Sequence, residues 1–196
     1  MHGLINRSIE AFIAYTYGPE TWAGIASAAE LPATGFEPLQ SYEDTVTARV
    51  LAAAADALQR EQAAILEDAG HYLVTNPGLP APRRLLRFGG DTFADFLHSL
   101  EDLHDRARLA LPDLDLPRIE VTEDVPGRFT LRHAWAAGLG PMITGALRAM
   151  ADDYGALALI EPGRGRRDDG QETISVRLLE SDFAQGRDFS LGRLAP

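Results

Sequence analysis

One histidine shares the apolar face of a predicted helix, where its imidazole could bind a ligand inside the protein. His104 lies in the stretch Phe93–Pro112, four positions after Leu100 and three before Ala107. Side chains at these spacings share one face of an α-helix, so we expect the imidazole of His104 to point toward the core. The apolar residues of this face recur every three or four positions: Phe93, Phe96, Leu97, Leu100, Leu103, Ala107 and Leu111.

An inward imidazole has two interpretations. As a core residue it hydrogen-bonds the backbone or a carboxylate, and periodicity alone favours this because buried polar groups usually find partners. As a functional residue, a neutral imidazole that faces an apolar cavity is the arrangement of the proximal ligand of a haem iron. Zinc is less favoured because it needs three or four ligands. The other histidines show no such ligand spacing: His2, His71, His98 and His133.

The composition excludes several classes of protein. The chain has 196 residues and no cysteine, which excludes disulfides, thiolate catalysis and cysteine metal sites. The formal net charge of −11 opposes binding to the phosphates of nucleic acid. The sequence has no apolar run of membrane-spanning length, no secretory signal and no catalytic motif. We therefore expect a cytoplasmic protein that is not an enzyme.

Helical periodicity dominates the first half of the chain, and strand periodicity dominates the second. We expect helices at Gly3–Tyr15, through Trp22 and Ile25, and at Ser41–Leu58, Arg60–Val74 and Asp91–Leu111. Three prolines predict a break at Thr75–Arg84. Alternation predicts strands at Arg118–Thr122, Arg128–Trp135, Ala156–Glu161 and Thr173–Glu180, with a helix at Gly138–Tyr154. This order, helices followed by β-β-α-β-β, predicts an α+β fold with a four-stranded antiparallel sheet.

The same pattern predicts one domain over residues 1–181. A helical part covers about residues 1–75, and a second part, with the His104 helix and the sheet, covers residues 83–181. Residues 182–196 show little pattern, and we expect them to form a mobile tail.

Three short motifs follow one another along the chain: Met1-His2-Gly3-Leu4-Ile5-Asn6, Gly70-His71-Tyr72 and Leu100-Glu101-Asp102-Leu103-His104. Over about residues 1–180 the sequence resembles the H-NOX family, the haem–nitric oxide/oxygen-binding domain related to that of soluble guanylate cyclase. The resemblance implies an H-NOX-like fold with haem b as the cofactor and His104 as the axial ligand of its iron. It also implies that Leu100 and Pro117 lie at the haem, with Pro117 beneath it.

One motif of that family is missing. The family binds the haem propionates with Tyr-Xaa-Ser-Xaa-Arg on the second strand, because buried carboxylates need donors and positive charge. Here the corresponding positions are Arg132, Ala134 and Ala136, or, shifted by one, His133, Trp135 and Ala137. A strand alternates its faces, so only one of Arg132 and His133 is expected to point inward, and an inward Trp135 would fill volume that haem needs. Two hypotheses follow: a haem sensor, or a haem-free ligand-binding or protein-interaction module with the same fold.

The resemblance also describes the gas-binding side. It places Leu4, Ile5, Leu73 and Met142 at the sixth coordination position of the iron, with Met142 where oxygen-binding members have a tyrosine. Without a hydroxyl donor, bound oxygen loses a stabilising hydrogen bond. We therefore expect the haem to bind nitric oxide and carbon monoxide. The chain shows no output domain, so we expect it to signal in trans, and family members pair with histidine kinases or diguanylate cyclases.

Overall fold

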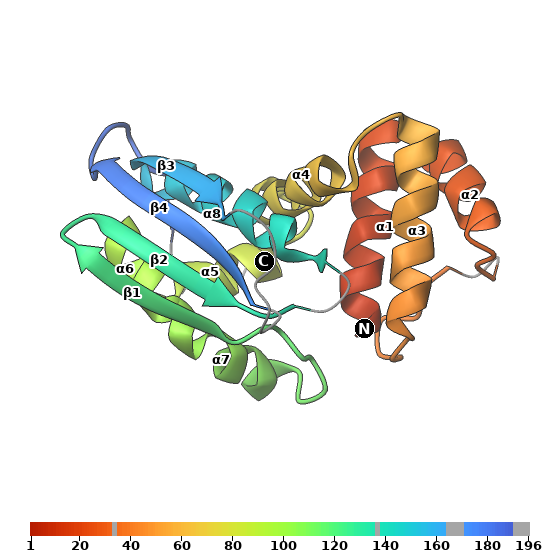
Figure 1. Ribbon diagram of the computed structural model, residues 1–196, viewed down its shortest axis with the longest axis horizontal. Helices are drawn as coiled ribbons and strands as arrows, with labels where there is room; N and C mark the ends of the chain where they lie inside the picture. The colour runs from red at the N-terminus through yellow and green to blue at the C-terminus, as the bar shows by residue number, and fades with distance from the viewer. Residues whose placement is uncertain (33–34, 136–137, 164–170, 190–196) are drawn as a thin grey trace, which may run out of the picture.

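The computed structural model describes residues 1–32, 35–135, 138–163 and 171–189 and confirms the α+β fold. Its two parts are visible in Figure 1, where α1, α2 and α3 lie on one side and the sheet, with α5 to α8, lies on the other. Helix α4 runs from the first part to the second. None of the helices in the described ranges is long and apolar enough to cross a membrane.

Four helices form the first part of the chain. Their bounds are Gly3–Tyr17 for α1, Pro19–Ala28 for α2, Asp44–Leu58 for α3 and Gln62–Thr75 for α4. Helix α1 starts at His2, whose Nδ1 accepts a hydrogen bond from the backbone N–H of Leu4 at 3.2 Å. This bond satisfies one of the N–H groups that a helix leaves free at its first turn. His2 is therefore the N-cap of the helix that begins the chain.

The predicted break at Thr75–Arg84 is wrong in part, because helix α5 covers Pro80–Arg87. Pro80 and Pro82 both stand in the first turn of this helix. The N–H groups of a first turn have no partner within the helix, so two prolines there remove no hydrogen bond. The proline-rich stretch therefore starts a helix where we expected only a loop.

The predicted helix around His104 is present, but it is interrupted. It consists of α6 (Phe93–Ser99), a 3₁₀ turn η1 (Leu100–Asp102) and α7 (Leu103–Ala110). The N–H of Leu103 bonds the carbonyl of Leu100, so the carbonyl of Ser99 loses its α-helical donor and accepts from Arg106 Nη2 at 3.2 Å instead. Glu101 Oε1 accepts the N–H of Val121 at 3.2 Å, which ties the turn to the edge of the sheet. These side-chain bonds favour a 3₁₀ turn that hydrophobic periodicity does not reveal.

The four strands form one antiparallel sheet in the order β1-β2-β4-β3. The strands cover Ile119–Val125 (β1), Arg128–His133 (β2), Leu157–Pro162 (β3) and Glu172–Glu180 (β4), and α8 (Gly140–Tyr154) lies between β2 and β3 in the chain. Strand β2 ends two residues earlier than we expected, and Trp135 follows it outside the sheet. Every second residue of β2 is buried: Phe129, Leu131 and His133. His133 therefore lies on the inner face of the sheet.

Helices α4 and α8 touch through their backbones at two glycines. A Cβ added to Gly70 would overlap the carbonyl oxygen of Met142, and a Cβ added to Gly145 would overlap that of Glu67. Only glycine allows this approach without moving one helix. Since α4 comes from the helical part and α8 belongs to the sheet part, this contact holds the two parts together.

We expect Gly145→Ala to lower the free energy of unfolding by about 1–3 kcal/mol, because the new methyl group would force α8 away from α4. Urea denaturation of the purified protein measures this change. The matched control is Gly24→Ala, in an exposed part of α2 where a Cβ would meet no atom within 4 Å. That change should raise the stability by about 0.4–1 kcal/mol. If both substitutions changed the free energy of unfolding by the same amount, the close contact of α8 with α4 at Gly145 would not explain the loss of stability.

Candidate functional site

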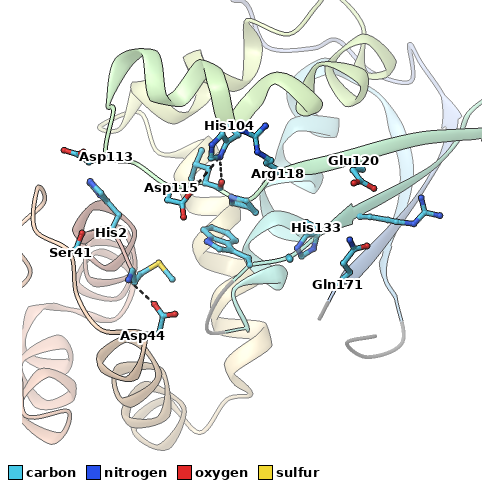
Figure 2. A pocket seen from close by; sticks show the side chains of 16 residues that line it. His2, Ser41, Asp44, His104, Asp113, Asp115, Arg118, Glu120, His133 and Gln171 are labelled. Carbon is cyan, nitrogen blue, oxygen red and sulfur yellow. Dashed lines mark hydrogen bonds and ion pairs between the residues drawn. The ribbon is translucent and has the colours of Figure 1, made fainter. Parts of the chain in front are cut away.

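A pocket of about 700 Å³ opens between the two parts of the molecule. Figure 2 shows His2, Ser41 and Asp44 on the helical side and His104, His133 and Gln171 on the opposite side. The volume lies within the range of about 300–1,000 Å³ that is common for small-molecule and cofactor sites. The pocket is therefore large enough for a ligand that touches both parts of the chain at once.

His104 lines this pocket from α7 with one ring nitrogen already held. Its side chain is buried, and Nδ1 lies 2.6 Å from the backbone carbonyl oxygen of Leu116. A carbonyl only accepts, so Nδ1 carries a proton and donates, and in the neutral form of the ring the lone pair is on Nε2. Nε2 takes no part in this hydrogen bond and is the ring nitrogen left for a ligand. A neutral imidazole fixed in this way is the form that binds a metal ion.

The loop after α7 places the carbonyl that holds His104. The helix ends at Ala110, and the N–H of Leu114 then bonds the carbonyl of Leu111 at 3.0 Å, which turns the chain back. Leu116 and Pro117 follow this turn and line the pocket. The sequence offers no signal for this hydrogen bond, because a backbone carbonyl is present at every residue. Sequence reasoning found Pro117 and missed Leu116 for that reason.

His133 lines the same pocket from the end of β2, and the described part of the chain offers its ring no hydrogen bond. The residue is only 2% exposed, and neither Nδ1 nor Nε2 has a partner. Burial lowers the pKa of His133 to about 4, because a low-dielectric site disfavours the charged form. The ring is therefore neutral near pH 7.

The rim of the pocket carries charges of both signs. Arg132 precedes the inward His133 and is paired in register with Glu120, yet both residues reach the pocket wall. Arg118 also lines the wall and lies 3.4 Å from Asp105. On the helical side the N-terminal ammonium lies 3.0 Å from Asp44. Of the two candidates on β2, His133 is the buried one, and Arg132 remains available as a cation at the edge.

Trp135 is buried in the pocket wall, with 9% of its surface exposed. It belongs to the same apolar cluster as Ile5, Leu139 and Met142. Ala134 also lines the pocket, whereas Ala136 and Ala137 lie outside the described residues. The indole therefore occupies part of the volume between the two parts of the molecule.

The structure brings four of the predicted site residues together and leaves five elsewhere. The pocket is lined by His104, Pro117, Arg132 and His133. The others do not line it: Leu4, Ile5, Leu73, Leu100 and Met142. Ile5 and Met142 are buried in the apolar cluster that also packs against Leu73, and Leu4 is half-buried in the first turn of α1. Leu100 lies in a separate cluster beneath the sheet.

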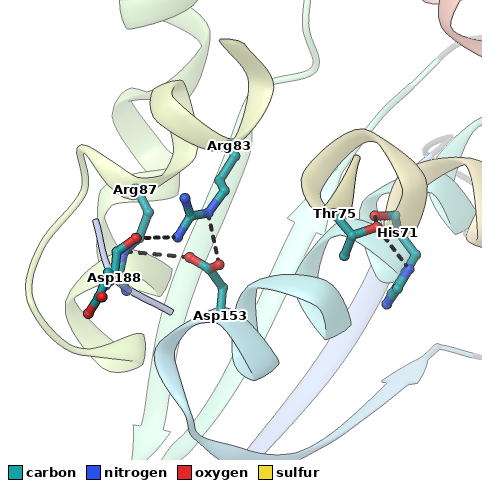
Figure 3. Close-up of polar contacts among 6 residues, drawn as sticks. All are labelled: His71, Thr75, Arg83, Arg87, Asp153 and Asp188. Atoms are coloured by element: carbon teal, nitrogen blue, oxygen red, sulfur yellow. Dashed lines mark hydrogen bonds and ion pairs between the residues drawn. The ribbon is translucent and has the colours of Figure 1, made fainter. Parts of the chain in front are cut away.

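A second polar cluster lies away from this pocket, where the C-terminal segment meets α5 and α8. In Figure 3, Arg83 reaches the buried carboxylate of Asp153, with Nε 2.8 Å from Oδ1, and the backbone carbonyl of Asp188 at 3.1 Å. The ring of Phe189 lies 5.6 Å from the guanidinium carbon of Arg83. Residues 182–189 of the expected tail thus make contacts, whereas residues 190–196 lie outside the described part and the expected mobility stays a prediction. None of the predicted site residues lines the pocket beside this cluster.

The residues of the first pocket fit a haem on its iron side. His104 presents a free Nε2, and no described group of three His, Cys, Asp or Glu side chains is placed to hold a metal ion by itself. A porphyrin supplies four iron ligands of its own, so one protein histidine is sufficient. On the propionate side, Arg132 offers charge and His133 offers a ring without partners.

We expect the ligand-free protein to lose stability as the pH falls from 6.5 toward 4. The pKa of His133 is about 4 when folded and about 6.5 when unfolded, so the unfolded chain binds the proton first in this window. Above pH 6.5 the ring is neutral in both states, so the free energy of unfolding is unaffected. It falls by up to about 3 kcal/mol as the pH is lowered to 4. His133→Phe should remove this part of the slope in urea denaturation series. If the stability of His133→Phe fell as steeply between pH 6.5 and 4, the pH dependence would not come from His133.

Comparison with known proteins places the chain in a family. The model of the Haem-NO-binding family matches residues 2–161. Soluble guanylate cyclases 89Db and 89Da of Drosophila melanogaster are 23% and 20% identical over 79% and 81% of this chain, which spans about a quarter of their length (23% and 24%).

Solved structures show the same fold. The unliganded Fe(II) H-NOX protein of K. algicida aligns with a TM-score of 0.78 and 17% identity, over 94% of this chain and all of that one. The H-NOX protein of S. oneidensis in the Fe(II)NO state aligns with a TM-score of 0.74 and 17% identity, over 92% of this chain and all of the other. Since the family model covers most of the sequence, this chain belongs to the Haem-NO-binding (H-NOX) family of haem-based gas-sensor domains, which is related to soluble guanylate cyclase.

Proposed function

We propose that this chain binds haem b through His104 and senses nitric oxide, with carbon monoxide as a second ligand. The observation that carries the proposal is the hydrogen bond from His104 Nδ1 to the carbonyl of Leu116, which leaves Nε2 free at a cofactor-sized pocket. When bound, the haem iron supplies a coordination position for a diatomic gas.

Each side of the pocket has its own role in this proposal. The carbonyl of Leu116 orients the ring of His104 and makes it a better electron donor, as partners of metal-binding histidines generally do. Pro117 continues the same wall and has no N–H that would compete for the ring. Arg132 provides positive charge for a carboxylate at the pocket edge.

The proposed choice of gas follows from the side chains that the family resemblance puts on the distal side. Leu4, Ile5, Leu73 and Met142 carry no hydroxyl or N–H in their side chains. Bound oxygen needs a hydrogen-bond donor far more than nitric oxide or carbon monoxide does. None of these four residues lines the pocket of the described structure, so the proposed preference for nitric oxide and carbon monoxide rests on the family resemblance.

The proposed signal is a movement of the helical part against the sheet part. His2 and Ser41 line the pocket from the first part, and His104 and His133 line it from the second. A ligand that touches both parts changes the balance between their relative positions only if it binds those positions unequally. The output is a separate protein, a histidine kinase or a diguanylate cyclase, that recognises one of these positions.

We expect His104→Gly to abolish haem retention, because the iron loses its protein ligand. Addition of free imidazole should restore the absorption spectrum, since the freed space accepts the missing ring. The matched control is His98→Gly, a change on the preceding helix at a histidine that is half exposed and pairs with Glu123 at 3.3 Å. Native spectra in His104→Gly without imidazole would contradict the role of His104.

We expect the ferrous protein to give nitric oxide and carbon monoxide complexes and no stable oxygen complex in air. Met142→Tyr adds a hydroxyl donor at the position where oxygen-binding relatives have one, and it should slow the dissociation of oxygen by about tenfold, the value of one hydrogen bond. Absorption spectra and stopped-flow rates measure both. A stable oxyferrous form of the unmodified protein would contradict the proposed gas preference.

A haem-free module is the second candidate, and Trp135 favours it. The indole is buried in the pocket wall, and the Tyr-Xaa-Ser-Xaa-Arg motif is missing. In that case the pocket holds a different molecule or a partner protein. The absorption spectrum of the protein as isolated, before and after addition of haem, separates the two functions, because only a histidine-ligated haem gives a strong Soret band.

A further inference from the structure

Two arginines stand side by side on the face of the sheet that points away from the core. Arg128 on β2 is paired in register with Arg177 on β4, and both side chains are exposed. Residues directly opposite each other in an antiparallel pair have Cβ atoms about 4.5–5.5 Å apart, so like charges there destabilise the sheet. Neither guanidinium forms a hydrogen bond or an ion pair with any residue that the structure describes. The pair therefore lacks the negative charge that would offset its repulsion.

Exposed apolar side chains flank the two arginines. In register across the sheet, Val125 of β1 lies opposite Arg128, and Leu159 of β3 lies opposite Arg177. Leu179 follows two positions after Arg177 on β4. The three apolar side chains are between 41% and 54% exposed, which is more than scattered contact with solvent requires. These five residues form what we call the outer sheet patch.

The outer sheet patch is uncovered in the described part of the chain. The opposite face of the sheet, which includes Leu131 and Val176, packs with residues of α6 and α8 in one apolar cluster. In Figure 1 the strands are drawn in front of these two helices, and no described helix lies in front of the strands. A partner can therefore reach the patch without a rearrangement of the fold.

We propose that the outer sheet patch is the docking site for a helix of a partner protein, which places a carboxylate between Arg128 and Arg177. A guanidinium binds a carboxylate through two parallel hydrogen bonds, so one acidic side chain can engage both arginines. Apolar residues on either side of that carboxylate cover Val125 and Leu159. This combination of arginine and apolar groups is typical of the energetically important centre of an interface.

The length of the row agrees with a helix that crosses the strands. Val125 and Leu159 are separated by three strand spacings, which is about 14 Å. A helix rises 1.5 Å per residue, so about nine or ten residues cover this distance. An acidic residue near the middle, with apolar residues one or two turns to either side, matches the order of the side chains along the row.

Charge and symmetry favour this occupant over a membrane or a second copy of the chain. The formal net charge of −11 repels a surface that is dense in phosphate groups. A symmetric dimer through the patch brings the same residues together from both copies, so four guanidiniums would meet at its centre. An acidic side chain of a different protein removes the repulsion that the two arginines create.

The test uses the full chain and two labelled peptides of about fifteen residues, with binding followed by fluorescence anisotropy. One peptide forms an amphipathic helix whose apolar face carries a glutamate between leucines, and the other has glutamine in that place. We expect the unmodified protein to bind the glutamate peptide about tenfold more tightly, the value of one charge-assisted hydrogen-bonded pair. The double variant Arg128→Gln, Arg177→Gln should bind both peptides with nearly equal affinity. Leu159→Ser should weaken the binding of both and keep the preference.

Two controls separate a docking role from a structural one. Arg49→Gln changes an exposed arginine on α3, in the other part of the molecule, and should leave the preference unchanged. The melting temperature of Arg177→Gln should be equal to or above that of the unmodified protein, because the change removes a like charge opposite Arg128. A lost preference in a protein that is no less stable then reflects the surface and not the fold.

Several results would overturn the proposal. It fails if the unmodified protein binds neither peptide or binds both equally, or if the double variant keeps the preference for glutamate. A dimer in sedimentation equilibrium that is lost in Leu159→Ser would assign the patch to a second copy. Binding to phosphatidylglycerol vesicles that requires both arginines would assign it to a membrane.

The proposal goes beyond the haem function and does not depend on it. The peptides report on the sheet face of the protein with or without a bound cofactor, and His104 takes no part in their binding. If added haem gives no histidine-ligated spectrum while the glutamate preference depends on Arg128 and Arg177, the haem function fails and the docking site stands.

Discussion

The direct backbone contact between α4 and α8 sets the distance on which the pocket depends. Gly70 and Gly145 let the two helices approach until the carbonyls of Met142 and Glu67 fill the space where a Cβ would stand. Helix α4 continues from the helical part, and α8 precedes the last two strands of the sheet. A ligand between the two parts therefore binds across the contact between α4 and α8, where backbone atoms set the spacing. A small change in that spacing would change the shape of the pocket.

The two histidines of the site differ in their hydrogen bonding within the chain. His104 has a fixed ring with one nitrogen already bonded to Leu116, which is how a metal ligand is held in advance. His133 is buried at the end of β2, and neither of its ring nitrogens has a hydrogen-bond partner among the described residues. His104 thus has one of its two ring nitrogens paired within the chain, whereas His133 has neither.

The sequence predicted the element order and the α+β fold because hydrophobic periodicity changes from helical to strand-like after Pro117. It missed α5, since the same prolines that stop a helix are tolerated in its first turn. It also missed the 3₁₀ turn at Leu100–Asp102, which depends on side-chain bonds from Arg106 and Glu101. In the site, His104 could be found from spacing, but its partner could not, because that partner is a backbone carbonyl.

The register of β2 shows which of the two candidate side chains on the strand is buried, and so favours one of the two motif alignments that the sequence left open. His133 continues the buried row of Phe129 and Leu131, and Trp135, which follows the strand outside the sheet, is buried as well. In the alignment that begins at His133, an imidazole stands in place of the family's phenol and an indole in place of its hydroxyl. Both keep an N–H donor, and the indole fills far more space than a hydroxyl. The chain thus keeps N–H donors at this edge, while the buried indole of Trp135 narrows the cavity. The opposite wall comes from the helical part, so the width of the cavity beside Trp135 is set by the contact between α4 and α8.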